Sequence, residues 1–409
     1  MKLIRVAFNL WLDYLTMDRS VFTENSPGRL WEVSVTDSRD WAFIPSPLLS
    51  EWKTNDPLPD SWESSTAIWS LLLQAREALA RLDGVGRYAQ NYNLLLRPLQ
   101  RREALRSSSL EGTYATPQQL LAFEIEHREP KSSNDPVNAW QEVWNYNRAL
   151  ERALNLLEQR PLSLNLIRDI HKTLLSDVRG SQRDPGNFRR SQVYIGSDRR
   201  FIPPPPNEVM PCLYDLEKFI HADKKLEPLI LCFVVHYQFE TIHPFLDGNG
   251  RVGRLLLSLM IYQLCDLNKP WLYLSAFFDR HKDEYINLLF QVSAEGKWKE
   301  WIIFCLRGTI EQSKDALSRF DKLLELRNHY MKLLGQAGGD IRLNRLIDHL
   351  FESPAITIPQ FSKMSGKHYN TARSDIERLA SAGILQESDF QKRPKIYFAL
   401  DILEIAYGD

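Results

Sequence analysis

Twelve residues near the middle of the chain, His243 to Arg254, bring together side chains that could handle a nucleotide and its phosphates. His243 is a group that can take up a proton near neutral pH. Asp247 offers a hard carboxylate oxygen, the usual way in which proteins hold Mg²⁺ beside substrate phosphates. Arg251 and Arg254 are three residues apart at the start of an expected helix, so both guanidinium groups face one side and could bind a polyphosphate.

Between these side chains, Gly248, Asn249 and Gly250 supply backbone. Glycine lets the backbone approach an anion closely, and the first N–H groups of the following helix point toward it. Asn249 is predicted to adopt a left-handed conformation that turns successive N–H groups inward as an anion nest. Taken singly, a capping histidine, a turn and two helical arginines are more often structural. Together they predict a nucleotide-phosphate site with a metal and a base.

Helical periodicity dominates the segments that must position this loop. Helices are predicted over residues 64–82, 96–111, 138–177 with a break near Pro161, 209–220, 228–241, 250–265 and 282–333. Residues 1–60 predict short strands and loops. Residues 192–202 alternate apolar and polar side chains around a turn at Gly196, which predicts a β-hairpin. The predicted fold class is therefore mainly α.

The C-terminal part of the chain has a pattern of its own after a predicted linker at residues 336–339. Helices are predicted over residues 342–351, 358–364 and 368–382, and a strand over residues 396–400. This order predicts a winged helix-turn-helix domain at residues 340–409. It holds nine Lys and Arg against ten Asp and Glu, so DNA binding, which needs local positive charge, and protein docking both stay open.

The composition narrows the class of protein. Lys and Arg total 51 against 52 Asp and Glu, so no global charge points to nucleic acid or a membrane. The spacing of the four cysteines matches no zinc or redox motif and fits a reducing compartment. No stretch approaches the roughly 20 apolar residues of a membrane span. We expect a cytoplasmic protein without a membrane partner.

The loop His-Pro-Phe-Leu-Asp-Gly-Asn-Gly-Arg-Val-Gly-Arg resembles the Fic family signature, H-x-F-x-D/E-G-N-G-R-x-x-R, without a departure. The resemblance continues at residues 79–84, 102–112, 141–146, 167–180 and 185–206. It implies a Fic-type helical bundle with three parts: an N-terminal region at residues 1–112, a catalytic core at 113–335 and the C-terminal domain. It also implies an enzyme that transfers AMP from ATP to a Ser, Thr or Tyr hydroxyl of a target protein, releasing pyrophosphate.

The resemblance assigns a role to each loop residue. His243 would be the general base, Asp247 would hold Mg²⁺, and Arg251 and Arg254 would bind the outer phosphates and the γ-phosphate of ATP. Gly248, Asn249 and Gly250 would form the anion hole, and Gly250 favours AMP transfer over kinase chemistry. Tyr285 would line the adenine pocket, although an aromatic residue on an amphipathic helix is more often part of the core.

The predicted hairpin resembles the flap with which the family clamps a target segment by strand addition. The residues that would dock the target are Gln192, Val193, Tyr194, Ile195 and Gly196. The alternative is a hairpin that only covers the core.

Ser107, Glu111 and Gly112 resemble the family's inhibitory helix motif. The resemblance implies that Glu111 pairs with Arg254 and blocks the γ-phosphate, whereas a plain surface ion pair is the alternative. Three other functions stay open: removal of AMP by a hydrolase that uses Glu111, a DNA-binding regulator with a Fic core as sensor, and a scaffold. The sequence also leaves open other nucleotides than ATP and a homodimer.

Overall fold

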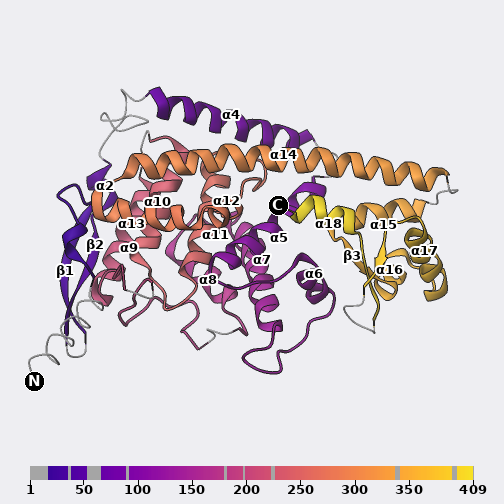
Figure 1. Ribbon diagram of the computed structural model, residues 1–409, viewed down its shortest axis with the longest axis horizontal. Coiled ribbons are helices and arrows are strands. Elements are labelled where there is room, and N and C mark those ends of the chain that lie inside the picture. Colours follow the sequence, from indigo (N-terminus) through magenta and orange to yellow (C-terminus); the bar gives the residue numbers. More distant parts are fainter. Residues whose placement is uncertain are drawn as a thin grey trace, which may run out of the picture. The chain divides into compact units, whose positions relative to one another are not determined.

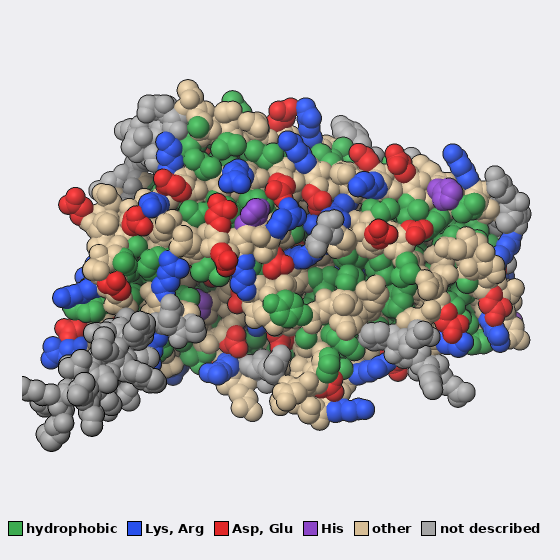
Figure 2. Space-filling view, in the orientation of Figure 1, with side chains coloured by type: hydrophobic (Ala, Val, Ile, Leu, Met, Phe, Trp, Pro, Cys, Tyr) green, Lys and Arg blue, Asp and Glu red, His purple; other side chains and the backbone are tan. Residues whose placement is uncertain are grey.

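The computed structural model describes residues 17–35, 38–52, 66–88, 92–178, 182–196, 199–222, 226–336, 341–388 and 394–408, and these residues are mostly helical (Figure 1). They form two compact units. The loop unit comprises Met1–Ala75, Glu151–Asp266 and Arg280–Gly308. The second unit comprises Arg76–Leu150, Leu267–Asp279 and Thr309–Asp409. Figure 2 shows acidic and basic side chains interspersed over one face of the molecule.

The loop unit is built around two consecutive helices. Its elements are η1 (Arg19–Val21), β1 (Gly28–Val35), β2 (Ser38–Pro45), α2 (Leu48–Glu51), α8 (Leu164–Leu174), α9 (Pro206–His221), α10 (Pro228–Ile242), α11 (Asn249–Leu264) and α13 (Lys282–Glu295). Every residue of α10 except Pro228 and Glu240 is buried, as expected for a helix that is apolar all round. It packs against α9, α11, α13 and β2, so α10 is the central element of this unit.

The first two strands form an antiparallel hairpin, paired from Gly28 opposite Pro45 to Val35 opposite Ser38. The predicted hairpin at residues 192–202 is reduced to one antiparallel bridge between Ile195 and Phe201. Residues 197 and 198 of its predicted turn lie outside the described residues. Phe201 packs instead with Phe43 of β2, so burial of this aromatic ring in the core limits the strand pairing.

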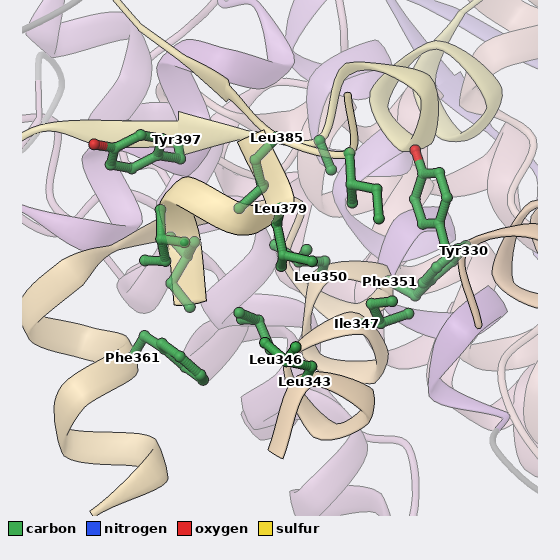
Figure 3. Packing of buried hydrophobic residues seen from close by; sticks show 14 of the residues in the cluster. Tyr330, Leu343, Leu346, Ile347, Leu350, Phe351, Phe361, Leu379, Leu385 and Tyr397 are labelled. Carbon is green, nitrogen blue, oxygen red and sulfur yellow. The ribbon is translucent and has the colours of Figure 1, made fainter. Parts of the chain in front are cut away.

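The second unit contains α5 and the C-terminal elements. They are α5 (Asn93–Leu110), α6 (Pro117–Ile125), α15 (Ile341–Glu352), β3 (Ala355–Thr357), α16 (Ile358–Ser365), α17 (Tyr369–Ser381), β4 (Gln386–Glu387), β5 (Ile396–Phe398) and α18 (Leu400–Tyr407). The three short strands form a sheet in the order β3-β5-β4. Figure 3 shows the core of these elements, where Leu343, Leu346 and Leu350 of α15 meet Phe361, Leu379 and Tyr397.

Four helices contribute residues to both units. They are α4 (Thr66–Tyr88), α7 (Val137–Leu157), α12 (Ser275–Arg280) and α14 (Trp298–Gln336). None of the helices in the described ranges combines the length and the apolar character that a membrane crossing requires.

The predicted helices are confirmed for most segments, and the errors have physical causes. α4 continues past the predicted stop at Asp83-Gly84 to Tyr88, because Asp83 accepts hydrogen bonds from the Asn268 backbone N–H at 2.8 Å and from Trp271 Nε1 at 3.2 Å. The predicted helix 282–333 is broken by Gly296, whose φ of +69° ends α13.

At the C-terminal end, the predicted strand 396–400 stops at Phe398, and α18 follows it. Gln336 of the predicted linker is helical, while residues 337–339 lie outside the described residues. The sequence did not predict α6 or α12. The three-part domain division stays a prediction, because compactness alone does not test whether a segment folds independently.

Candidate nucleotide-phosphate site

α10 places His243 through the way in which the helix begins and ends. Its first turn is capped by the Glu227 carboxylate, which accepts from Leu229 N at 2.7 Å and Ile230 N at 3.2 Å, and Pro228 occupies the first helical position. His243 is the C-cap and takes a left-handed conformation with φ +49° and ψ +61°. This conformation is uncommon for a non-glycine residue, and it turns the chain sharply into the loop.

The His243 ring is oriented by a backbone carbonyl. Its Nδ1 lies 3.3 Å from the carbonyl oxygen of Glu240. Because a carbonyl only accepts hydrogen bonds, Nδ1 carries the proton in the neutral ring, and Nε2 carries the lone pair. The side chain is half-buried. In the neutral ring the unprotonated nitrogen is therefore Nε2.

α11 starts the other side of the loop, and here one sequence prediction is wrong. The left-handed residue is Gly248, with φ +77°, whereas Asn249 is already the first residue of the helix. The Asn249 side chain instead bridges the backbone of Phe245, accepting from its N–H at 2.8 Å and donating to its carbonyl at 2.9 Å. Glycine takes the strained position, because it has no Cβ, and asparagine fixes the loop before it.

Arg251 and Arg254 lie on the first turns of α11 and are 4% and 3% exposed. Arg251 Nη2 lies 3.8 Å from Asp247 Oδ1, and the Asp247 side chain is 45% exposed. Arg254 lies near His236, whose pKa is lowered to about 3 by burial and by the positive charge of Arg254. The loop and the start of α11 thus combine two buried guanidinium groups with one half-exposed carboxylate, which lies 3.8 Å from Arg251.

Gly253 lets α10 and α11 approach each other closely. A Cβ at this position would lie 2.1 Å from Glu240 Oε1 and 3.0 Å from the ring of Phe239. His236 Nδ1 donates to the Gly253 carbonyl at 3.2 Å, and its Nε2 accepts from the Tyr285 hydroxyl at 2.9 Å. These contacts fix α11, and with it the arginines, against α10.

The donor set at the loop suits a cation that is shared with phosphates. Among the described residues, no group of three or more His, Cys, Asp and Glu side chains could hold a metal ion. Asp247 is the loop's acidic side chain, and Mg²⁺ commonly binds one or two carboxylates together with substrate phosphates and water. The residues present fit Mg²⁺ that arrives with a nucleotide.

The structure adds two residues that sequence reasoning did not select. Arg189 is buried and donates from Nε to the His243 carbonyl at 2.8 Å and from Nη2 to the Pro204 carbonyl at 2.6 Å. Burial lowers its pKa to about 10. His171 of α8 contacts the backbone carbonyl of Asp247 through Nε2 at 3.0 Å. A histidine within the apolar face of α8 was a signal for His171, whereas no local pattern distinguishes Arg189.

Tyr285 is 4% exposed, and its hydroxyl is engaged by His236. This burial favours the core interpretation, and the adenine contact stays a prediction.

In the predicted flap, Ile195 N–H donates to the Phe201 carbonyl at 2.9 Å. Gln192 Nε2 donates to the Pro203 carbonyl at 2.9 Å. Hydrogen bonds therefore join the residues before and after the predicted turn. Docking of a target by Gln192 to Gly196 stays a prediction.

The residues of the predicted inhibitory motif lie at the end of α5. Ser107 is fully buried in α5. Glu111 is the exposed C-cap of the helix, and Gly112 follows with φ +79°. Glu111 belongs to the second unit and Arg254 to the loop unit, and their pairing stays a prediction.

Comparison with protein families finds two adjacent domains in this chain. Residues 69–155 match the model described as Fic/DOC family N-terminal, and residues 161–261 match the Fic/DOC family model. The second match contains the whole loop from His243 to Arg254.

Among curated proteins, the chain is 32% identical over 112 residues to "Protein adenylyltransferase Fic" of Drosophila grimshawi, covering 26% of this chain and 22% of that protein. The corresponding Drosophila melanogaster protein is also 32% identical over 112 residues, covering 26% of this chain and 21% of the relative. The chain therefore spans about a fifth of the length of these relatives.

Two solved structures share the fold. A Fic family protein from Desulfovibrio desulfuricans has a TM-score of 0.54 at 18% identity, over 85% of this chain and 98% of that one. Fic-1 (aa134–508) from C. elegans has a TM-score of 0.50 at 21% identity, over 62% of this chain and 74% of that one. At these identities the likeness shows the fold alone.

Proposed function

This chain belongs to the Fic/DOC family, and from that premise we propose that it transfers AMP from ATP to a Ser, Thr or Tyr hydroxyl of a target protein. The observation that carries the proposal is the loop between α10 and α11. It places a histidine with its lone pair on Nε2, a half-exposed carboxylate and two buried guanidinium groups within twelve residues. The relatives named adenylyltransferases support the same reaction.

In the proposed reaction the hydroxyl oxygen of the target attacks the α-phosphorus of ATP. The new bond joins that oxygen to phosphorus, the bond from phosphorus to the bridging oxygen of pyrophosphate breaks, and the hydroxyl proton passes to His243 Nε2. Positioning and charge neutralisation dominate the catalysis of phosphoryl-type transfers. Arg189, by binding the His243 carbonyl, holds the base at its place on the loop.

The phosphates of ATP would bind at the start of α11. The first N–H groups of a helix carry partial positive charge and bind anions, and Gly248 brings the backbone close to them. Arg251 and Arg254 would neutralise the outer phosphates. Asp247 would hold Mg²⁺, which supplies further neutralisation of the phosphate charge when it is bound.

The second part of the proposal is that Glu111 acts as a brake, that is, that it inhibits AMP transfer in the resting protein. Glu111 stands at the end of α5 after a buried turn that contains Ser107. A carboxylate is a good bidentate partner for a guanidinium group, so Glu111 bound to Arg254 would compete with the γ-phosphate. We expect the resting protein to be weakly active.

Two of the cations on the C-terminal elements are paired with carboxylates. Arg373 Nε pairs with Glu377 at 2.8 Å, and Lys395 Nζ pairs with Glu387 at 2.6 Å. These pairs offset two of the cations on which a DNA contact would depend. For this region, DNA binding and docking of a protein, either the target or another subunit, both stay predictions.

Mass spectrometry after incubation with ATP and Mg²⁺ tests the proposal on wild type, Glu111→Gly and His243→Ala. We expect a mass gain of one AMP that is weak in wild type, strong in Glu111→Gly and absent in His243→Ala. Equal modification of wild type and Glu111→Gly would reject the brake. An adduct that persists in His243→Ala would reject the assigned base.

A further inference from the structure

His171 lies outside the loop motif, yet both of its ring nitrogens bind backbone at the site. It belongs to α8, and its side chain is fully buried. The Gly186 N–H donates to His171 Nδ1 at 2.8 Å, and His171 Nε2 lies 3.0 Å from the carbonyl oxygen of Asp247. Because Nδ1 accepts, the ring proton is on Nε2, and His171 donates it to Asp247.

The ring also packs flat on the loop. His171 stacks on Phe245 with a centroid separation of 3.7 Å and an interplanar angle of 11°. Phe245 in turn is held at both its N–H and its carbonyl by the Asn249 side chain. A stacked ring and three hydrogen bonds therefore tie α8, the loop and the start of α11 together, and a fourth joins α8 to Gly186.

The contact with Asp247 has a specific consequence for its side chain. Asp247 is followed by Gly248, a residue with unusually wide backbone freedom. A hydrogen bond on the Asp247 carbonyl limits rotation of the peptide between these two residues. The direction of the Asp247 carboxylate depends on this backbone, and outer contacts of this kind commonly set the orientation of a metal-binding carboxylate.

We propose that His171 is a positioning residue that holds Asp247 in the orientation required to bind a nucleotide-bound divalent cation. This inference rests on the proposed function only in taking Asp247 as the residue that holds the cation. Loss of the His171 hydrogen bonds is expected to weaken the contribution of Mg²⁺ to nucleotide binding by about tenfold, the lower end of the effects seen for outer-shell partners.

The test measures the dissociation constant of an ATP analogue with a methylene group between the α- and β-phosphates, which cannot donate AMP. Calorimetric titrations of the full chain with and without Mg²⁺ give the ratio of the two constants. In His171→Phe the ring is kept and both hydrogen bonds are lost, so we expect this ratio to fall about tenfold. His171→Gln has one acceptor and one donor and is expected to restore part of it.

The matched control is His221→Phe. His221 of α9 is also a histidine of this unit that binds a backbone carbonyl, that of Leu162 at 2.6 Å, and it is no part of the phosphate site. Its loss should leave the Mg²⁺ ratio unchanged. An unchanged ratio in His171→Phe, an equal fall in His221→Phe, or a wild type without any Mg²⁺ enhancement would each overturn the proposal.

The same titrations separate this inference from the proposed reaction. A wild type that shows the Mg²⁺ enhancement but never transfers AMP would reject the proposed function and leave the role of His171 standing. Melting temperatures of all variants show whether each one is folded at the titration temperature.

Discussion

The molecule contains buried arginines in two settings that differ in how their carboxylate partners are held. In the second unit, Arg101 of α5 binds Glu124 with its Nε and Nη2 at 2.9 Å each and donates to the Glu352 carbonyl at 2.6 Å. Its partner Glu124 is only 17% exposed. In the loop unit, Arg251 meets Asp247 at 3.8 Å, and that carboxylate is 45% exposed.

This difference teaches that burial of an arginine does not by itself mark a ligand site. Arg101 and Glu124 form a buried bidentate ion pair with two short hydrogen bonds. Breaking this pair would leave a buried charge without a partner. The Arg251 pair is long and its acidic side faces solvent, so a phosphate or a cation can reach it at little cost. The exposure of the partner distinguishes a structural arginine from one that can bind a substrate.

The largest expected effect on stability comes from breaking the buried pair between Arg101 and Glu124. Arg101→Met should lower the free energy of unfolding by about 3–5 kcal/mol, because the Glu124 carboxylate would be left buried without its partner. Urea denaturation followed by circular dichroism measures this loss. The control is Arg373→Met, whose exposed pair with Glu377 should contribute less than about 1 kcal/mol. Equal losses in both variants would break the comparison.

Arg251→Met tests the arginine whose carboxylate partner, Asp247, is half-exposed. We expect AMP transfer to slow by about 10²-fold, comparable with the removal of one charge-stabilising donor from an active site. The free energy of unfolding should change by less than about 1 kcal/mol, because its partner is half-exposed. Single-turnover kinetics and urea denaturation measure the two effects. A large loss of stability with unchanged transfer would place Arg251 in the structural class.

The buried His236, which lies near Arg254, makes the stability of the fold depend on pH. Its pKa in the folded protein is about 3, against about 6.5 in the unfolded chain. The unfolded state therefore binds the proton more readily, and stability falls as the pH drops below about 6.5 and continues to fall toward about 3. At pH 5 the loss should be about 2 kcal/mol. Thermal unfolding measured across this range should show a flatter acid slope for His236→Phe, and an identical slope would contradict this origin.

The smallest expected change in stability belongs to Asp247→Asn. The free energy of unfolding should change by less than about 0.5 kcal/mol, because a long and half-exposed ion pair contributes little. Mg²⁺ should no longer strengthen nucleotide binding in this variant. Glu124→Gln is the matching substitution in the buried pair with Arg101, and it should lower the free energy of unfolding several-fold more than Asp247→Asn. The comparison would fail if Asp247→Asn were the more damaging of the two.

The loop itself could be predicted from sequence, because its functional side chains are close along the chain. The predicted helices 228–241 and 250–265 correspond closely to α10 and α11. The residues that hold the loop could not be predicted in this way. Arg189 and His171 come from segments well before it, and their contacts are made only in the folded chain.

Local signals also failed where tertiary contacts outweighed them. Asp83-Gly84 is a reasonable helix stop, but the Asp83 carboxylate is engaged by Asn268 and Trp271, and α4 continues. The alternating pattern at residues 192–202 predicted strands, yet packing of Phe201 in the core leaves one bridge. In both cases the partners are distant in sequence, and periodicity carries no information about them.

The surroundings of α5 have a consequence for biosynthesis. α5 ends at residue 110, but it packs against α15 and α18. Arg101 donates to the backbone carbonyl of Glu352, and Leu105 packs against the buried cluster that contains Phe398 and Leu403. These partners leave the ribosome some 240 to 300 residues later. Since long-range contacts form late and leave apolar surface exposed meanwhile, the helix that is capped by Glu111 acquires its native environment only after α15 and α18 have been synthesised.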